Sequence, residues 1–245
     1  MFELKKSLHR IAGSIAPNLE QRLSEARWLR QHARELRRDL IQADSVEKRV
    51  RIALSPGQLR SSQKPVEILS LLKEVESLSP KTLCEIGADK GGTLALFASV
   101  VAPNARILSL DIHYPGSRAR VYRMLAQKTQ SISCLEADSH VRDTLRKVQL
   151  WLHGQQLDFL FIDGDHSYDG VKSDYEMYGP LVRPGGIIAF HDICPDFRTR
   201  HGIKTSSDVG EVPRFWCELK QRGVDWTEFV EDPEQDGYGI GIVRV

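Results

Sequence analysis

From Lys81 onward the chain alternates between short apolar runs and longer segments in which apolar residues recur every three or four positions. The short runs are typical of buried strands and the longer spacing is typical of amphipathic helices. The expected strands cover 82–87, 105–111, 131–138, 157–164, 184–192 and 238–245. The expected helices cover 93–101, 119–129, 141–151, 168–181 and one segment after Arg214. Strict alternation predicts a doubly wound α/β fold with a mostly parallel sheet, and the last strand is expected to be an antiparallel insertion near the sheet edge.

The N-terminal region has a helical pattern without strands. Its apolar residues fall on one helical face, namely Leu19, Leu23, Ala26, Leu29, Ala33, Leu36 and Leu40. We therefore expect a helical arm over residues 1–60 and the main domain over 61–245. A helix outside the sheet needs a partner for its apolar face, so the stripe is expected to pack on a second subunit or on its own domain. A homo-oligomer assembled through this helix is the preferred prediction.

Composition excludes several classes of protein. Hydrophobic residues make up 41% of the chain, but no run approaches the roughly 18 apolar residues of a membrane span. The four cysteines are scattered without a CxxC pair, which argues against a zinc site or a disulfide framework. With no secretory signal, a cytoplasmic protein is expected. The net charge is +1, although residues 1–60 carry 13 Lys and Arg against 7 Asp and Glu. Such a bias is typical either of a basic arm for nucleic acid or a membrane surface or of a solvated helical face, and the solvated face is the preferred interpretation.

Polar and glycine residues follow the first three strands, where an open α/β sheet binds its ligand. The first strand runs into Gly87-Ala88-Asp89-Lys90-Gly91, whose glycines allow close backbone approach. The second strand ends in Asp111, an acid suited to both ribose hydroxyls. The third is followed by Asp138 and Ser139, suited to an adenine edge. Together these residues predict a nucleoside site.

Two nucleoside cofactors compete for this site. A dinucleotide fold needs small residues where Asp89 and Lys90 stand, and the acid Glu85 on the first strand is badly placed near pyrophosphate. The same acid suits a cationic ligand that carries an amine. This comparison favours S-adenosylmethionine over NAD.

The fourth and fifth strands end in a second group of polar residues. Asp163 ends one strand and His191-Asp192 ends the other, so the three side chains are expected to meet and to bind a divalent cation. His166 lies on the same rim, where its imidazole is a candidate general base.

The block FIDGDHSYDGVKSDYEMYGPLVRPGGIIAFHDI and the turn EIGADKGGT resemble the class I methyltransferase family that includes cephalosporin-hydroxylase-like proteins and macrolide-sugar O-methyltransferases. The resemblance extends from about Ser62 to the C-terminus. It implies a Rossmann-like methyltransferase fold with a seven-stranded sheet, and S-adenosylmethionine at Glu85, Gly87, Asp111 and Asp138. It also implies catalysis by His166 and Asp163, with Mg²⁺ held by Asp163 and Asp192. In the metal-dependent relatives an acid stands where this chain has His191, and a hard cation prefers oxygen ligands.

The expected reaction is therefore methylation of a hydroxyl on a small molecule or a glycan. A nicotinamide-dependent oxidoreductase and a non-catalytic interaction protein with a vestigial domain are the alternatives. A nucleic-acid substrate is disfavoured, because no aromatic and basic residues interleave as in single-strand binders. Acceptor specificity is expected in the loops 114–120 and 196–211, the second of which carries Arg198, Arg200, His201 and Lys204.

Overall fold

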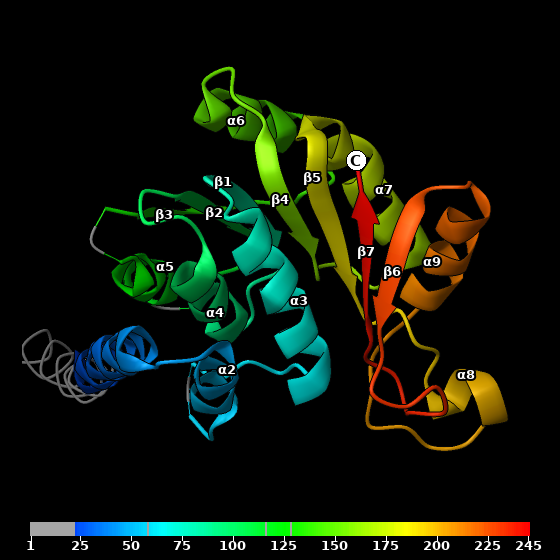
Figure 1. Ribbon diagram of the computed structural model, residues 1–245, viewed down its shortest axis with the longest axis horizontal. Coiled ribbons are helices and arrows are strands. Elements are labelled where there is room, and N and C mark those ends of the chain that lie inside the picture. Colours follow the sequence, from blue (N-terminus) through cyan, green and yellow to red (C-terminus); the bar gives the residue numbers. More distant parts are fainter. Residues whose placement is uncertain (1–22, 58, 116, 128) are drawn as a thin grey trace, which may run out of the picture.

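The computed structural model describes residues 23–57, 59–115, 117–127 and 129–245 (Figure 1). Seven strands form one sheet in the order β3-β2-β1-β4-β5-β7-β6. The strands are β1 Thr82–Ile86, β2 Arg106–Asp111, β3 Ser131–Glu136, β4 Leu157–Ile162, β5 Val182–His191, β6 Asp225–Phe229 and β7 Ile240–Arg244. The helices are α2 Val46–Leu54, α3 Pro65–Leu78, α4 Gly92–Val100, α5 Arg118–Tyr122, α6 Arg142–Leu152, α7 Tyr168–Tyr178, α8 Phe197–His201 and α9 Val212–Gln221. The short 3₁₀ helices η1 Arg123–Leu125 and η2 Gly179–Leu181 follow α5 and α7.

The predicted fold class is confirmed. Strands β1 to β5 pair in parallel, and β7 lies antiparallel between β5 and β6, as expected for the last strand. Strands β1, β2 and β4 are largely buried apolar runs, as expected for parallel strands covered on both faces, whereas the edge strand β3 is mostly half-buried. Strand β6 and helix α3 were not among the elements expected from the apolar pattern.

Two apolar cores lie on opposite faces of the sheet. One core joins the inner faces of α2, α3 and α4 to one side of the strands. The other joins α6, α7 and α9 to the opposite side, around the fully buried Tyr178, Phe215 and Trp216. This gives the three-layer arrangement seen in Figure 1. Among the described residues no helix has both the length and the apolar character that a membrane crossing needs.

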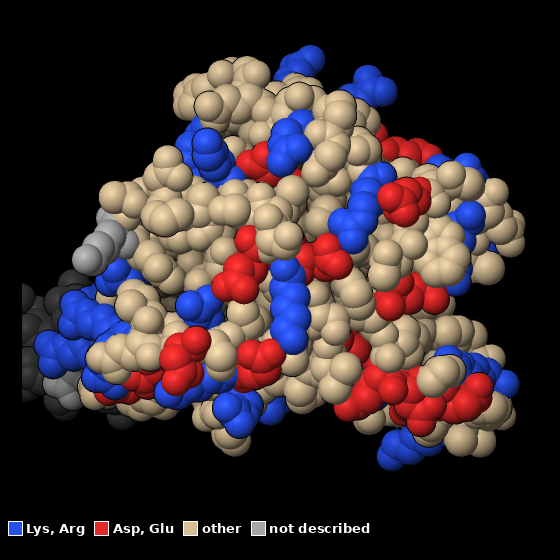
Figure 2. All heavy atoms as spheres, in the orientation of Figure 1, with Lys and Arg blue, Asp and Glu red and all other residues tan. Residues whose placement is uncertain are grey.

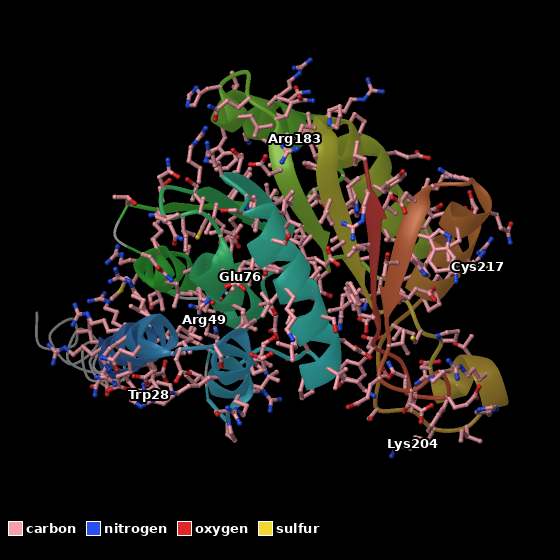
Figure 3. All side chains as sticks on the ribbon, in the orientation of Figure 1. Trp28, Arg49, Glu76, Arg183, Lys204 and Cys217 are labelled. Atoms are coloured by element: carbon pink, nitrogen blue, oxygen red, sulfur yellow. The ribbon has the colours of Figure 1, made fainter. Side chains whose placement is uncertain are left out.

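Residues 23–42 form the helix that the N-terminal stripe predicted. Ala33 and Leu40 of the stripe are buried in the same core as α2 and α4, whereas Leu23 is 50% exposed. Leu19 lies outside the described residues. Helix α2 follows after a short break and is tied to α3 by an ion pair between Arg49 and Glu76, whose nitrogen and oxygen atoms are 3.5 Å apart (Figure 3). Figure 2 shows Lys and Arg side chains over these N-terminal helices with acidic side chains among them, a mixed polar surface.

Candidate active site

A cavity of about 640 Å³ opens at the carboxyl ends of the parallel strands. Residues that follow β1, β2 and β3 line one half, and residues that follow β4 and β5 line the other. The cavity is within the size range of small-molecule sites, and its place beyond the strand ends is the expected one for an open α/β sheet. It brings together eight of the nine candidate residues named from the sequence, since Gly87, Asp111, Asp138, Ser139, Asp163, His166, His191 and Asp192 all line it.

Gly87 lets the chain turn immediately after β1. Its φ angle is +85°, and an added Cβ would lie 1.9 Å from the carbonyl oxygen of Asp163. Only glycine combines that backbone conformation with so close an approach. The turn after β1 and the end of β4 therefore form one continuous wall between the two halves of the cavity.

The acids after β2 and β3 are already oriented by backbone donors. Asp111 accepts hydrogen bonds from the N–H of Ala88 at 2.8 Å and from that of His113 at 2.9 Å. Asp138 accepts from the N–H of His140 at 2.8 Å. A carboxylate has about four acceptor positions, so both acids keep capacity for a ligand's hydroxyl or amine.

Glu85 lies beneath the cavity and does not line it. Its side chain is fully buried in β1, and neither carboxylate oxygen has a hydrogen-bond partner among the described residues. Burial raises the pKa of Glu85 well above its usual value, and the charges of Asp163 and Asp111 raise this pKa further. The group is therefore neutral unless a cation approaches it, which is the electrostatic requirement for binding a ligand amine.

The ends of β4 and β5 form the predicted histidine and aspartate cluster. The Nδ1 atom of His191 lies 3.1 Å from Oδ1 of Asp163 and 3.2 Å from Oδ2 of Asp192. Burial alone would lower the pKa of His191, but the two carboxylates outweigh it and raise that pKa well above its usual value. Burial likewise opposes ionisation of Asp163, yet the charge of His191 and the hydrogen bonds from both histidines bring its pKa down to about 2. The cluster is thus a set of mutually neutralising charges.

His166 faces the same two carboxylates from the turn before α7. Its Nε2 atom lies 3.7 Å from Oδ1 of Asp163 and 3.5 Å from Oδ2 of Asp192. Its Nδ1 atom hydrogen-bonds the carbonyl of Asp208, which fixes Nδ1 as the donor and points Nε2 into the cavity. The interaction with Asp163 is the main cause that raises the pKa of His166 to about 9; burial opposes this rise, and the charges of Asp192 and Asp163 add to it. The imidazole has therefore to lose a proton before it accepts one.

The donor set of the cluster fits a divalent cation. Ligand atoms of Asp163, His191 and Asp192 lie within 4.8 Å of one another. Two carboxylates and an imidazole suit Mn²⁺, Fe²⁺ or Zn²⁺ better than Mg²⁺, which prefers oxygen ligands. Because Nδ1 of His191 now shares a proton with the carboxylates, a cation would bind by displacing that proton.

Several residues of the cavity had no counterpart in the sequence reasoning. Gln63 donates its side-chain N–H to Oδ2 of Asp163 at 3.1 Å. Tyr238 contacts the His191 ring edge to face, with the ring centroids 5.9 Å apart. In the other half, Nε2 of His140 lies 3.5 Å from Oδ1 of the buried Asp174. The apolar pattern gives no signal for these residues, because they come from loops and from the inner face of a helix.

The segment 231–239, which carries Tyr238 into the cavity wall, is held in place by a buried acid of α3. Glu67 is fully buried and accepts hydrogen bonds from the Gln235 side chain at 2.7 Å and from the N–H of Gly239 at 2.9 Å. The Nζ atom of Lys64 donates to the side-chain oxygen Oε1 of Gln235 at 3.0 Å. These hydrogen bonds therefore join the segment 231–239 to the start of α3, although the two are far apart in the sequence.

The loops expected to shape acceptor specificity contribute differently. None of the described residues of the first loop, 114–115 and 117–120, lines the cavity, whereas Ser206, Ser207 and Asp208 of the second loop do. The four basic residues of that loop do not line the cavity either. Arg200 pairs with Glu234 at 3.3 Å, and Lys204 lies at the periphery of the molecule (Figure 3). Small polar side chains, and not the cations, face the site.

Comparisons with known proteins identify a related domain within the chain. Residues 84–193 match the model of a methyltransferase domain family. The chain is 25% identical over 154 residues to an uncharacterised protein of Sinorhizobium fredii and 29% identical over 124 residues to one of Acanthamoeba polyphaga mimivirus. These matches cover 59% and 45% of this chain, but only 16% and 51% of those proteins.

Solved structures share the fold. An O-methyltransferase from Bacillus cereus in complex with S-adenosylhomocysteine superposes with a TM-score of 0.55 at 20% identity, covering 84% of this chain and 93% of its own. The O-methyltransferase TomG from Streptomyces achromogenes, involved in tomaymycin synthesis and solved with S-adenosylmethionine, gives 0.56 at 18% identity, covering 84% and 91%. Residues 84–193 therefore match a methyltransferase domain, and the chain has the fold of these two O-methyltransferases.

Proposed function

We propose that this chain transfers a methyl group from S-adenosylmethionine to a hydroxyl of a small, polar or sugar-bearing acceptor. The observation that carries the proposal is the single cavity, in which the nucleoside-binding acids and the histidine and aspartate cluster face each other. Structural neighbours solved with the cofactor or its product support the choice of cofactor.

Each residue of the cofactor half has a role in this proposal. Asp111 accepts the two ribose hydroxyls, and Asp138 with Ser139 takes the adenine edge. Glu85 ionises against the cationic end of the cofactor, whose charge offsets the cost of an unpaired buried carboxylate. Gly87 leaves the backbone close enough for the cofactor to lie across the ends of β1 and β4.

In the other half, His166 acts as the general base. The acceptor oxygen attacks the sulfonium methyl carbon, the C–S bond breaks towards sulfur, and the hydroxyl proton passes to Nε2 of His166. The hydrogen bond from His166 to Asp208 and the charge of Asp163 orient the ring for this transfer. A divalent cation held by Asp163, His191 and Asp192 would lower the pKa of the acceptor hydroxyl when bound.

The acceptor side of the cavity supports a polar acceptor. Its lining includes Ser62, Gln63, Ser206, Ser207 and Tyr238, while Ile86, Leu110 and Ile112 belong to the cofactor half. Hydroxyl and amide groups of this kind pair with a ligand rich in hydroxyls and give a flat apolar ligand little to pack against.

The proposal is tested by titration calorimetry and by a transfer assay. We expect S-adenosylhomocysteine to bind with micromolar affinity and NAD to give no saturable heat. Labelled methyl transfer from S-adenosylmethionine is then screened against free sugars, glycosides and catechols. Saturable NAD binding without any S-adenosylhomocysteine binding would contradict the methyltransferase assignment and favour an oxidoreductase. Transfer to catechols alone would contradict the polar acceptor.

We further propose that the helix over residues 23–42 contributes to a homo-oligomer. Leu23, Trp28 and Ile41 are 50%, 45% and 48% exposed on a helix that also buries Ala33 and Leu40. Replacing all three with Ser should reduce the mass measured by light scattering, with Leu150→Ser, an exposed position on α6, as the control. An unchanged mass would remove this helix from the interface. The cytoplasmic location expected from the sequence stays a prediction.

A further inference from the structure

Gln63 stands apart from the other residues of the histidine and aspartate cluster. It precedes α3 and lies outside the matched region 84–193. Its side chain lines the cavity although the residue is only 7% exposed. Because its amide N–H binds Oδ2 of Asp163 and His191 binds Oδ1, both oxygens of that carboxylate are engaged.

The carbonyl half of the Gln63 side-chain amide has no hydrogen-bond partner within the described part of the chain. Its nitrogen has to face Asp163, since the reverse orientation would set two oxygen acceptors against each other. The carbonyl oxygen Oε1 is then the remaining group, and it is buried without a hydrogen bond in the described structure. Buried carbonyl oxygens nearly always have a hydrogen-bond partner. The Gln63 oxygen can pair only with a hydrogen-bond donor or with a cation.

The backbone holds this segment firmly at the cavity. The hydroxyl of Ser61 lies 2.9 Å from that of Thr93, and the N–H of Ser61 donates to the carbonyl of Ala53 at 2.8 Å. Gly92, the first residue of α4, has room for no Cβ, because that atom would lie 2.0 Å from the nitrogen of Ser61. The position of Gln63 is thus set before any ligand arrives.

We propose that Gln63 completes the cation-binding cluster, with its N–H holding Asp163 and its carbonyl oxygen coordinating the same divalent cation. The cluster has two carboxylates and one imidazole, and side-chain amide carbonyls are ordinary ligands of hard and intermediate cations. Gln63 restores an oxygen ligand to a set in which His191 supplies nitrogen. The assignment rests on the proposed function, because this cation would be the one that assists methyl transfer.

Manganese binding tests the assignment without an acceptor. Mn²⁺ is titrated into the protein saturated with S-adenosylhomocysteine, and free Mn²⁺ is followed by electron paramagnetic resonance. We expect one Mn²⁺ per chain, bound at least tenfold more weakly by Gln63→Leu. Gln63→Glu should bind at least as tightly as the parent, since its carboxylate supplies an oxygen and the cation offsets repulsion from Asp163. Gln155→Leu, an exposed glutamine that bonds Arg106, is the matched control and should bind as the parent does.

Three results would overturn the assignment. The first is a parent protein that binds no Mn²⁺, and the second is Gln63→Leu binding within twofold of the parent. In the third, Gln63→Glu is as weak as Gln63→Leu, which would show that Gln63 only holds Asp163. Circular dichroism confirms that each variant is folded, and calorimetry without Mn²⁺ measures S-adenosylhomocysteine in the same samples. If the parent protein binds S-adenosylhomocysteine but not Mn²⁺, only the inference about Gln63 is refuted. If it binds neither, the proposed function is refuted as well.

Discussion

The turn after β1 allows a steric prediction whose size follows from the structure. In Gly87→Ala the new methyl group would lie 1.9 Å from the Asp163 oxygen and 2.5 Å from the Asp163 carbonyl carbon. Ordinary non-bonded contact lies near 3.5 Å, so the ends of β1 and β4 have to separate by more than about 1 Å. The obstacle is backbone, which cannot rotate away. The same separation displaces Asp163 from His191.

Two destabilising effects add in Gly87→Ala. An alanine held at positive φ costs about 1–2 kcal/mol, and the overpacked contact costs about 1–3 kcal/mol more. Gly154→Ala separates them, because Gly154 has a φ of +78° with no atom within 4 Å of an added Cβ. The difference in unfolding free energy between the two variants, measured in urea, should therefore be about 1–3 kcal/mol.

Ligand binding provides the second measurement. Gly87→Ala should weaken S-adenosylhomocysteine binding at least tenfold, whereas Gly154→Ala, in the turn between α6 and β4, should leave it unchanged. If both variants lose the same stability and both bind normally, the close approach of Gly87 to Asp163 does not shape the site, and the reasoning is refuted.

Three further predictions follow from single groups. Asp111→Ala should weaken S-adenosylhomocysteine binding by about 1–3 kcal/mol in calorimetry, because the ribose loses its charged acceptor. Asp143→Ala on α6 is the control, and equal affinities of the two variants would count against the ribose role of Asp111. With the pKa of His166 at about 9, turnover without added metal should rise about tenfold per pH unit from pH 7 and level off near pH 9, as the neutral base accumulates; a flat profile would contradict the base assignment. Burial raises the pKa of Asp174 to about 6, so the folded state binds the proton more tightly than the unfolded state and stability falls as pH rises from about 4 to about 6. Asp174→Asn should therefore raise the unfolding free energy by about 1–3 kcal/mol at pH 7.5 and change it little at pH 4, and a gain that is equal at both pH values would argue against this linkage.

The centre of the sheet was predictable because burial on both faces leaves a continuous apolar signal. Strands β1, β2, β4 and β5 carry that signal, and their parallel order brings Asp163, His191 and Asp192 to one edge. Strand β6 was missed because it is an edge strand whose residues are exposed or half-buried, with charges at Asp225 and Glu228. Helix α3 was predictable from the sequence, because Pro65 lies in its first turn and its apolar residues recur at helical spacing.

The acceptor side of the site could not be predicted in the same way. Gln63, Tyr238 and the segment 206–208 reach the cavity through contacts between residues far apart in sequence, which leave no periodic pattern. The pKa of His166 is a similar case. Its sequence position indicates a base near neutrality, but two carboxylates from different strands move that pKa to about 9.

The bond between Glu67 and the segment 231–239 has a consequence for how the protein is made. Synthesis proceeds from the N-terminus, so α3 leaves the ribosome long before Gln235 and Gly239 exist. Until then the carboxylate that belongs in a dry interior has only water as a partner, which opposes premature closure of this corner. The nascent chain can assemble β1 to β5 and their helices first, and the wall carrying Tyr238 can seal only when the last strand emerges. A chain that stopped before Gln235 would therefore be left with an open cavity as well as a missing strand.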